Sequence, residues 1–316
     1  MFIRLTRILS VLCICVAFSY TGHAQSGIYI ERKGWSIGSQ FGMSDLWGDV
    51  GTKSPIDHYT NSKYFNKVTF MGGLMGRYTF HPCFAVRLEM NYGSLFATDQ
   101  WNYDLAKGTG GIGSGGSDAV QRYVRNQNAK DVVVEGMTLF EFTPGRVSPE
   151  NEIAHKRNQP YIAAGIAIFH YTPYSTVGTS PHYVQTYNLD LEGQGWGSGY
   201  PPKQSLWQPA IPLAIGYRWD VGEHLNLGVE FMYRYTFTDY LDGVSGKYVS
   251  QAAYNAHLSP ANAILADEVA DKAQYATSPV TPSTGVRGNS SNNDSYSTIS
   301  FTIFYKINTK RKEWWH

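Results

Sequence analysis

The sequence predicts an all-β fold, an eight-stranded antiparallel transmembrane β-barrel with long extracellular loops and short periplasmic turns. Three observations predict it. Eight segments are candidate strands, and most of them alternate apolar and polar residues with a period of two, which is typical of strands that have one apolar and one polar face. The connections between these segments alternate between long and short, as in outer-membrane barrels. Aromatic residues are dense, at 15%, whereas charged residues are sparse, at 16%.

The start of the chain is typical of a secretory signal peptide. Two arginines precede an apolar run over residues 8–18, and the small residues of Gly22-His23-Ala24 allow cleavage near Gln25. The run is shorter than the ~20 apolar residues that a membrane helix needs. The expected division is a signal peptide over 1–24, a barrel over 25–307 and a basic and aromatic periplasmic tail over 308–316.

In most of the eight expected strands, bulky apolar side chains alternate with charged, hydroxyl, amide or glycine residues. In order the strands are 35–42, 68–80, 84–93, 132–142, 161–171, 211–220, 226–235 and 299–307. The third is the clearest, because Phe84, Val86, Leu88, Met90 and Tyr92 alternate with small or polar residues. The fourth alternates less cleanly. The fifth is apolar on both faces, so its facing stays open.

The strand pattern also indicates which face meets lipid. Backbone polar groups inside a bilayer must be paired internally, and closing the sheet into a barrel achieves this. We therefore expect the apolar faces to point to lipid and the charged faces to point into the lumen. Aromatic residues near strand ends are expected to form interfacial girdles. These residues are Trp35, Tyr92, Tyr171, Trp219 and Tyr235.

Eight charged residues are expected to face the lumen. They are Arg77, Arg87, Glu89, Glu135, Glu141, Arg218, Glu230 and Arg234. An eight-stranded barrel leaves an interior just wide enough for side chains, and buried charges must be paired there. We interpret the set as a salt-bridge network that fills the barrel. The alternative is a proton relay or a catalytic constellation, but the expected inward faces carry no Ser-His-acid triplet. We expect neither a pore nor an enzyme.

Composition and motifs argue against several other classes. Two of the 26 basic residues leave with the signal peptide, so 24 remain against 25 acidic residues, which gives no electrostatic case for nucleic acid. A GxGxxG pattern at 108–113 lies in a glycine-rich segment without the flanking strand and helix of a dinucleotide site, so we interpret it as a loop tip. No metal-ligand spacing appears, and no cofactor is expected. Residues 261–273 could form a short helix in the last long loop.

Cys83 is the one cysteine that remains after signal cleavage, and it follows His81 and Pro82 in a turn expected on the periplasmic side. It cannot form an intramolecular disulfide. Two interpretations stay open, an intermolecular bridge to a periplasmic partner and a small residue at the membrane rim. Other candidate partner-binding residues lie in the next turn and the tail. They are Arg146, Arg157, Lys310, Arg311, Lys312, Trp314 and Trp315, and the tail ones could instead anchor at the interface.

Four stretches resemble the PorG outer-membrane proteins of the type IX secretion system. They are SDLWGDVG at 44–51, QPYIAAGIAIFHYTP at 159–173, LEGQGW at 191–196 and YRYTFTDYLDGVSGKYV at 233–249. The resemblance covers most of residues 35–249 and the last strand, and within it Tyr-Leu-Asp-Gly-Val-Ser is the most specific part. Segments 107–117 and 251–294 depart from the family pattern.

The resemblance implies an integral outer-membrane barrel of a Gram-negative cell, without enzymatic activity. Members of this family associate with a periplasmic ring built from the lipoprotein PorK and its partner PorN, and couple that ring to the outer membrane. The expected partners are therefore such a ring, by disulfide at Cys83 or otherwise, and outer-membrane lipid. Two other functions stay open. One is an adhesin-like barrel that acts outward through its long loops, and the other is a lipid-modifying enzyme.

Overall fold

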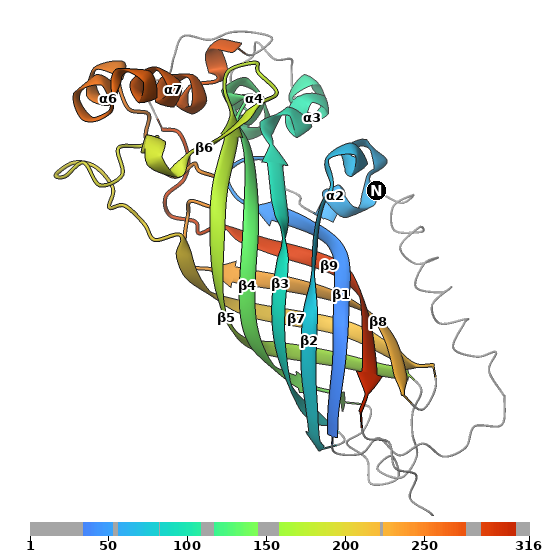
Figure 1. Cartoon of the computed structure of the whole chain (residues 1–316). Helices are drawn as coiled ribbons and strands as arrows, with labels where there is room; N and C mark the ends of the chain where they lie inside the picture. The colour runs from blue at the N-terminus through green and yellow to red at the C-terminus, as the bar shows by residue number, and fades with distance from the viewer. Residues whose placement is uncertain are drawn as a thin grey trace, which may run out of the picture.

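The computed structural model describes residues 34–52, 56–81, 83–108, 117–144, 158–221, 224–275 and 286–307. Eight long strands form one closed antiparallel barrel (Figure 1). They are β1 (Gly34–Trp47), β2 (Thr69–His81), β3 (Phe84–Thr98), β4 (Asn128–Phe142), β5 (Asn158–Thr176), β7 (Trp207–Asp220), β8 (Leu225–Thr236) and β9 (Ser295–Lys306). Sequence neighbours pair with each other, and β1 pairs with β9 to close the barrel. The predicted fold and strand number are confirmed.

The period-two pattern faces as predicted. Leu74, Met90 and Phe301 point outward with 72%, 72% and 75% of their surface exposed, whereas inward residues are buried. The facing of β5, which the sequence left open, follows the same rule. Ile166 is exposed on the outside and Phe169 is buried inside. The barrel therefore carries a broad apolar outer surface of the kind that suits lipid.

One residue of the expected aromatic girdles was predicted wrongly. Tyr171 is 2% exposed and points into the barrel, between the equally buried Phe169 and the loops above. In β5 the odd-numbered residues face inward, and Tyr171 is one of them. The sequence did not show which face of this strand points inward, so Tyr171 could be placed wrongly on the outer face. The other four members lie on the outer surface as expected, namely Trp35, Tyr92, Trp219 and Tyr235.

Several strands run further than the alternation indicated. β3 continues to Thr98, and β4 already begins at Asn128. At these ends both faces are covered, since Leu95, Phe96 and Ala97 are all buried in succession. Alternation is the signal of a strand with one exposed face, so it disappears where loops cover the outside as well.

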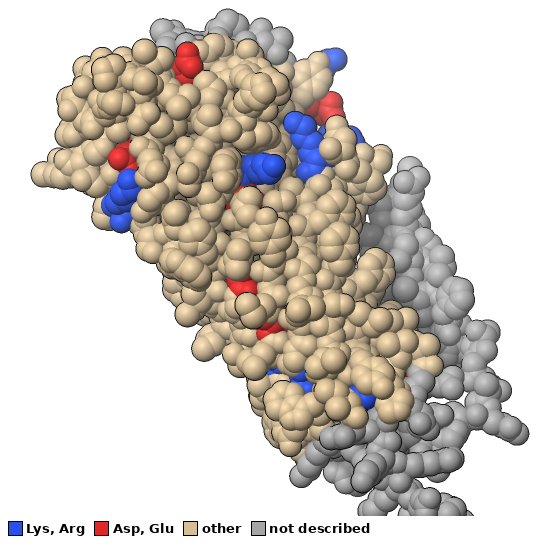
Figure 2. Space-filling model, viewed as in Figure 1, with Lys and Arg blue, Asp and Glu red and all other residues tan. Residues whose placement is uncertain are grey.

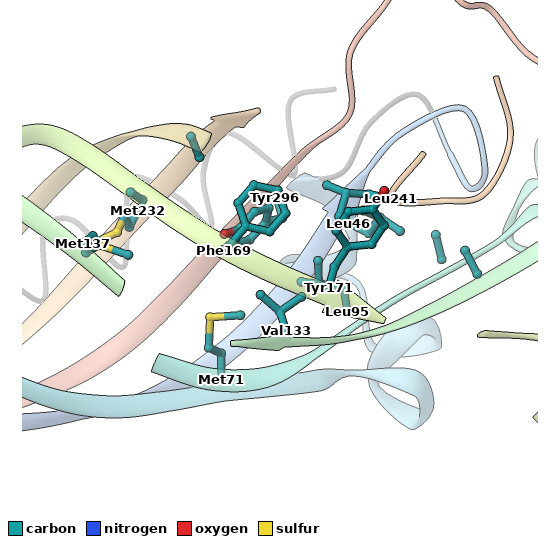
Figure 3. Close-up of a cluster of buried hydrophobic side chains, with 14 of the residues drawn as sticks. Leu46, Met71, Leu95, Val133, Met137, Phe169, Tyr171, Met232, Leu241 and Tyr296 are labelled. Carbon is teal, nitrogen blue, oxygen red and sulfur yellow. The ribbon is translucent and has the colours of Figure 1, made fainter. Parts of the chain in front are cut away.

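A buried apolar cluster fills the part of the barrel nearest the loops (Figure 3). Leu46, Val133 and Phe169 contribute from strands, and Leu241 comes from the long connection after β8. Phe169 packs edge-on against Tyr296, with ring centroids 5.5 Å apart. The inside of the barrel is therefore mostly apolar at this end, where Asp131 is a buried acid, and carries the paired charges further along. The sequence analysis did not predict this division.

The long connections fold together at one end of the barrel (Figure 1), and we call their described residues within 48–68, 99–127, 177–206 and 237–294 the loop cap. Its elements are α2 (Ile56–Thr60), η1 (Ser62–Lys67), η2 (Asp99–Asn102), α3 (Tyr103–Gly108), α4 (Asp118–Arg125), β6 (Tyr183–Gln185), η4 (Tyr187–Leu189), α6 (Gln251–His257), α7 (Pro260–Ala270) and η5 (Ala273–Tyr275). The opposite end of the barrel carries the short turns, and we call it the turn end.

Helix α7 confirms the helix predicted within 261–273. Ser259 caps it by accepting a hydrogen bond from the backbone of Asn262, and Pro260 occupies its first turn, where a missing N–H costs nothing. Its alanine face packs on Tyr254 of α6 and Leu191 in a second apolar cluster. No helix in the described part of the chain is long and apolar enough to cross a membrane.

Candidate functional sites in the lumen and the loop cap

Glu141 on β4 is the centre of the charged cluster toward the turn end. Its carboxylate lies 2.6 Å from Arg77 Nε, 2.9 Å from Arg87 Nη1 and 3.1 Å from Arg218 Nη2. The three arginines come from β2, β3 and β7, so one carboxylate ties together strands across the barrel. All four side chains are at most 5% exposed.

Arg87 links this centre to the middle of the lumen. Its Nε lies 2.5 Å from Glu89 Oε1, and its Nη2 lies 2.7 Å from Glu230 Oε2. The same Glu230 oxygen accepts a hydrogen bond of 2.8 Å from the Tyr161 hydroxyl. Gln40 donates to Glu89 Oε2 at 2.9 Å. One guanidinium therefore contacts three carboxylates, which the planar fork of arginine permits.

A separate pair lies nearer the loop cap. Arg234 Nη2 and Glu135 Oε1 are 2.7 Å apart. The Tyr296 hydroxyl donates to Glu135 Oε2 at 2.6 Å, and Asn91 Nδ2 donates to Oε1 at 2.9 Å. The uncharged partners complete the hydrogen bonding that a buried carboxylate needs.

All eight residues expected in the lumen lie inside the barrel, and ion pairs connect them in two groups. Four arginines balance four glutamates, so the set is formally neutral. The sequence analysis did not assign Gln40, Asn91, Tyr161 and Tyr296 to the network, although their inward parity was a usable signal. It also left out the pair of Lys306 and Asp220, 3.1 Å apart at the turn end.

The loop cap holds a second polar site, in which three of the stretches that carry the resemblance meet. Asp242 accepts hydrogen bonds from the backbone of Val50 and of Val244, each 2.8 Å long. Glu192 accepts from the backbone of Ser245 at 2.8 Å and of Gly246 at 2.7 Å. Buried carboxylates therefore fasten the first, third and fourth long connections to one another.

Two arginines, the buried Arg287 and the partly buried Arg125, complete this fastening. Arg287 Nη1 lies 3.0 Å from Glu192 Oε1. Arg125 at the end of α4 lies 2.8 Å from Asp99 Oδ2, and it also donates to the backbone oxygens of Asp49 and Arg287 at 2.6 and 2.9 Å. Arginine suits this role because it can serve several acceptors in one plane. The second long connection thus joins the other three.

Burial alters the acidity of the cap residues. It raises the pKa of Asp242 to about 7, and the negative charge of Asp49 adds to this effect. Burial also raises the pKa of Asp239 to about 8. Burial lowers the pKa of Lys272 to about 7, and the positive charge of Arg287 adds to this effect; the ammonium donates to Ser175 Oγ at 2.7 Å. Among the described residues, no group of acidic, histidine or cysteine side chains could hold a metal ion.

A Thr-His-Asp arrangement lies outside the barrel wall. Thr52 Oγ1 and His58 Nε2 are 2.8 Å apart, and His58 Nδ1 lies 2.7 Å from Asp45 Oδ1. The sequence analysis examined only inward faces, and Asp45 faces outward on β1. All three residues are at most 7% exposed, and Trp101 and Tyr64 pack on the imidazole. This burial keeps substrate from the hydroxyl, so the arrangement fastens α2 to β1.

Cys83 lies at the turn end, where the sequence placed it, but its surroundings differ from the expectation. Its backbone N–H donates to His81 Nδ1 at 3.2 Å, and its carbonyl accepts from Thr143 at 2.8 Å. It is only 3% exposed, so the expectation that a partner could readily reach it is wrong for this conformation. Residues 1–24, Pro82, Arg146, Arg157, Lys310, Arg311, Lys312, Trp314 and Trp315 lie outside the described residues.

These features define the class of the protein as a closed eight-stranded β-barrel with an apolar outer surface, a charge-filled interior and a folded loop cap.

No protein-family model matches the chain, and no curated protein matches its sequence. Solved structures with similar folds include Ail of Yersinia pestis, at 9% identity, covering 87% of this chain and 100% of Ail with a TM-score of 0.37. Neisserial surface protein A shares 9% identity, covering 87% and 97%, with a TM-score of 0.36. OprG from Pseudomonas aeruginosa shares 9% identity, covering 89% and 99%, with a TM-score of 0.33. Similarity at this level assigns neither a family nor a function.

Proposed function

We propose that this chain is a non-enzymatic outer-membrane barrel of a type IX secretion machinery in a Gram-negative cell. In this role it anchors a periplasmic ring of PorK-like and PorN-like proteins through its turn end. One observation carries the proposal. Stretches that resemble the PorG family, far apart in sequence, meet in the loop cap through Asp242 and Glu192. These contacts join the resembling stretches into one structural unit, which supports the resemblance as a property of the folded cap.

The lumen supports an anchor over a transporter. Four arginines and four glutamates pair across it, and apolar side chains fill the end nearest the loop cap. An anchor needs a rigid barrel that stays in the membrane, and paired charges across several strands provide rigidity. The exposed apolar surface supports placement in the outer membrane.

The low exposure of Cys83 favours non-covalent docking at the turn end over a disulfide bridge. Non-reducing gels of outer membranes, wild type beside Cys83→Ser, test this choice. We expect identical bands for both forms. A high-mass band that reductant and the Cys83→Ser substitution both abolish would instead establish the bridge.

Deletion of the gene tests the proposed role. We expect secreted cargo to accumulate in the periplasm and the periplasmic ring to lose its association with the outer membrane, with both defects restored by the wild-type gene. Normal secretion in the deletion strain would overturn the proposal.

An outward-acting, adhesin-like barrel is the second candidate. The observation that favours it is that the long loops form a folded cap with apolar clusters of their own. In that case the deletion strain would secrete normally but lose attachment to surfaces. An altered lipid profile with both other functions intact would instead indicate a lipid-modifying enzyme.

A further inference from the structure

Charges are scarce on the outward face of the barrel. Among the described strand residues, Asp45 and Lys130 are the two that have outward parity and carry a full charge. Asp45 is buried beside His58. Lys130 lies near the cap end of β4 and is partly exposed. This leaves one lysine at the edge of an otherwise uncharged outer surface.

A second lysine lies next to the same position. The ammonium of Lys67, at the end of η1, lies 5.2 Å from the centroid of the Phe96 ring, and Phe96 is opposite Lys130 in the β3–β4 register. Lys130 itself lies 5.2 Å from the centroid of the Tyr183 ring. The aromatic rings hold both ammonium groups close to the wall of the barrel.

Neither lysine has a carboxylate partner among the described residues, and both therefore differ from two neighbouring lysines. Lys63 lies 2.8 Å from Asp104, and Lys203 lies 2.8 Å from Asp190. Within the described part of the chain, no carboxylate therefore competes with an outside ligand for the ammonium groups of Lys67 and Lys130.

The surface just below the two lysines is apolar. Tyr92, Met90 and Val134 are 65%, 72% and 42% exposed, and Tyr92 is opposite Val134 in the register. Figure 2 shows basic side chains gathered where the strands meet the loop cap, above a strand surface that is largely free of charge. A ligand that matches both parts needs an anionic head and an apolar body.

We propose that Lys67 and Lys130 bind a phosphate of an outer-leaflet lipid, the lipid A part of lipopolysaccharide, whose acyl chains lie along Tyr92, Met90 and Val134. Lysine is a suitable point charge for phosphate, and basic residues at a membrane boundary recognise anionic lipid heads. The inference rests on the outer-membrane placement of the proposed function and is independent of any role in secretion.

Lipid binding by the purified mature chain in detergent micelles tests the inference. Native mass spectrometry would measure affinity for bisphosphorylated and for dephosphorylated lipid A. The test variant is the Lys67→Gln/Lys130→Gln double substitution, and the matched control is Lys63→Gln/Lys203→Gln, which removes the same charge from ion-paired positions. Heat-modified migration on gels verifies that every variant forms the barrel.

We expect the test variant to bind bisphosphorylated lipid A at least tenfold more weakly than wild type, and the control to remain within about twofold. Dephosphorylated lipid should bind all forms equally. Equal affinity of wild type and test variant, equal losses in test and control variants, or a loss that persists with dephosphorylated lipid would each overturn the proposal. If the two lysines bind an acidic protein instead of lipid, wild type and test variant should have the same affinity for lipid A, which would overturn the proposal. Secretion is measured separately, so either proposal can fail alone.

Discussion

At the scale of single residues, the lumen depends on a few carboxylates that each serve several partners. Glu141 contacts three arginines, and Arg87 in turn contacts three glutamates. Isolated buried charges are strongly unfavourable, whereas a paired set is tolerated when geometry and hydrogen bonds are good. The network therefore stabilises one strand register, because a slip of one residue would turn these charges toward lipid.

Replacing Glu141 with Gln should destabilise the barrel strongly. The substitution keeps the shape but removes the negative charge that Arg77, Arg87 and Arg218 share, which leaves the eight buried charges with a net charge of +1, at a cost of about 3–5 kcal/mol in the free energy of unfolding. Urea unfolding in lipid vesicles measures this. Phe140→Leu, at the adjacent outward position, should cost less than about 1.5 kcal/mol. Equal stability of Glu141→Gln and wild type would contradict the assigned network.

Asp242 makes the stability of the loop cap depend on pH. Burial keeps its carboxyl protonated up to about pH 7 in the folded cap, whereas the ordinary pKa is 3.8. Between these values unfolding of the cap releases a proton, so the cap loses stability as pH rises from about 4 to 7. Protease resistance of the cap should fall severalfold across this window. Asp242→Asn should make the profile less steep, with a remainder from Asp239, whose pKa burial raises to about 8. Asp118→Asn, at an exposed site, should leave the profile unchanged.

The sequence predicted which charged residues face inward, but not which of them contact each other. Alternation places Arg87 and Glu230 on inward faces, but their contact depends on how β3 and β8 are oriented across the barrel. The same limit applies to Tyr161 and Tyr296, which share the inward parity yet look like girdle aromatics in a sequence. The Thr52, His58 and Asp45 contact depends on how a loop folds back on a strand, which no local pattern encodes.

At the scale of elements, the strands were predictable and the loop cap was not. Period-two alternation located most strands, and an apolar run located β5. The extensions of β3 and β4 lie under the cap and lose the alternation. Among the helices, the one within 261–273 was anticipated. Short helices such as α4 have too few residues for a periodic signal, and tertiary contacts like those of Arg125 decide whether they form.

Glu192 should be the main tie between the third and fourth long connections. Glu192→Ala leaves the Ser245 and Gly246 amides without this acceptor and removes the carboxylate partner of Arg287, which should cost about 2–4 kcal/mol of local stability. Limited proteolysis of folded protein should then cleave the cap much faster while the barrel stays intact on heat-modification gels. Glu268→Ala, at a partly exposed site on α7, is the control. Unchanged cleavage of Glu192→Ala would show that the tie is dispensable.

At the scale of the whole molecule, a closed barrel separates two ends of different character. One end carries a folded cap that joins four connections, and the other carries short turns. The charged network and the apolar cluster fill the space between these ends. A filled interior suits a protein that works as a fixed point in the membrane.

Reconstitution in a planar lipid bilayer should give no stable ion conductance. An eight-stranded barrel has little space beyond its own side chains, and here paired charges and apolar residues fill it. Single-channel recording measures this, with a wide porin as the positive control. Reproducible, discrete conductance steps from the wild-type protein would contradict a plugged lumen.

The anchor role is the central claim, and crosslinking in intact cells followed by pull-down of the tagged protein tests it most directly. The experiment compares wild type with Cys83→Ser and omits reductant. We predict that both forms capture the same periplasmic lipoprotein of a secretion ring, because docking at the turn end does not need the buried thiol. Recovery of outer-membrane lipid alone, with no periplasmic protein in either form, would contradict the account.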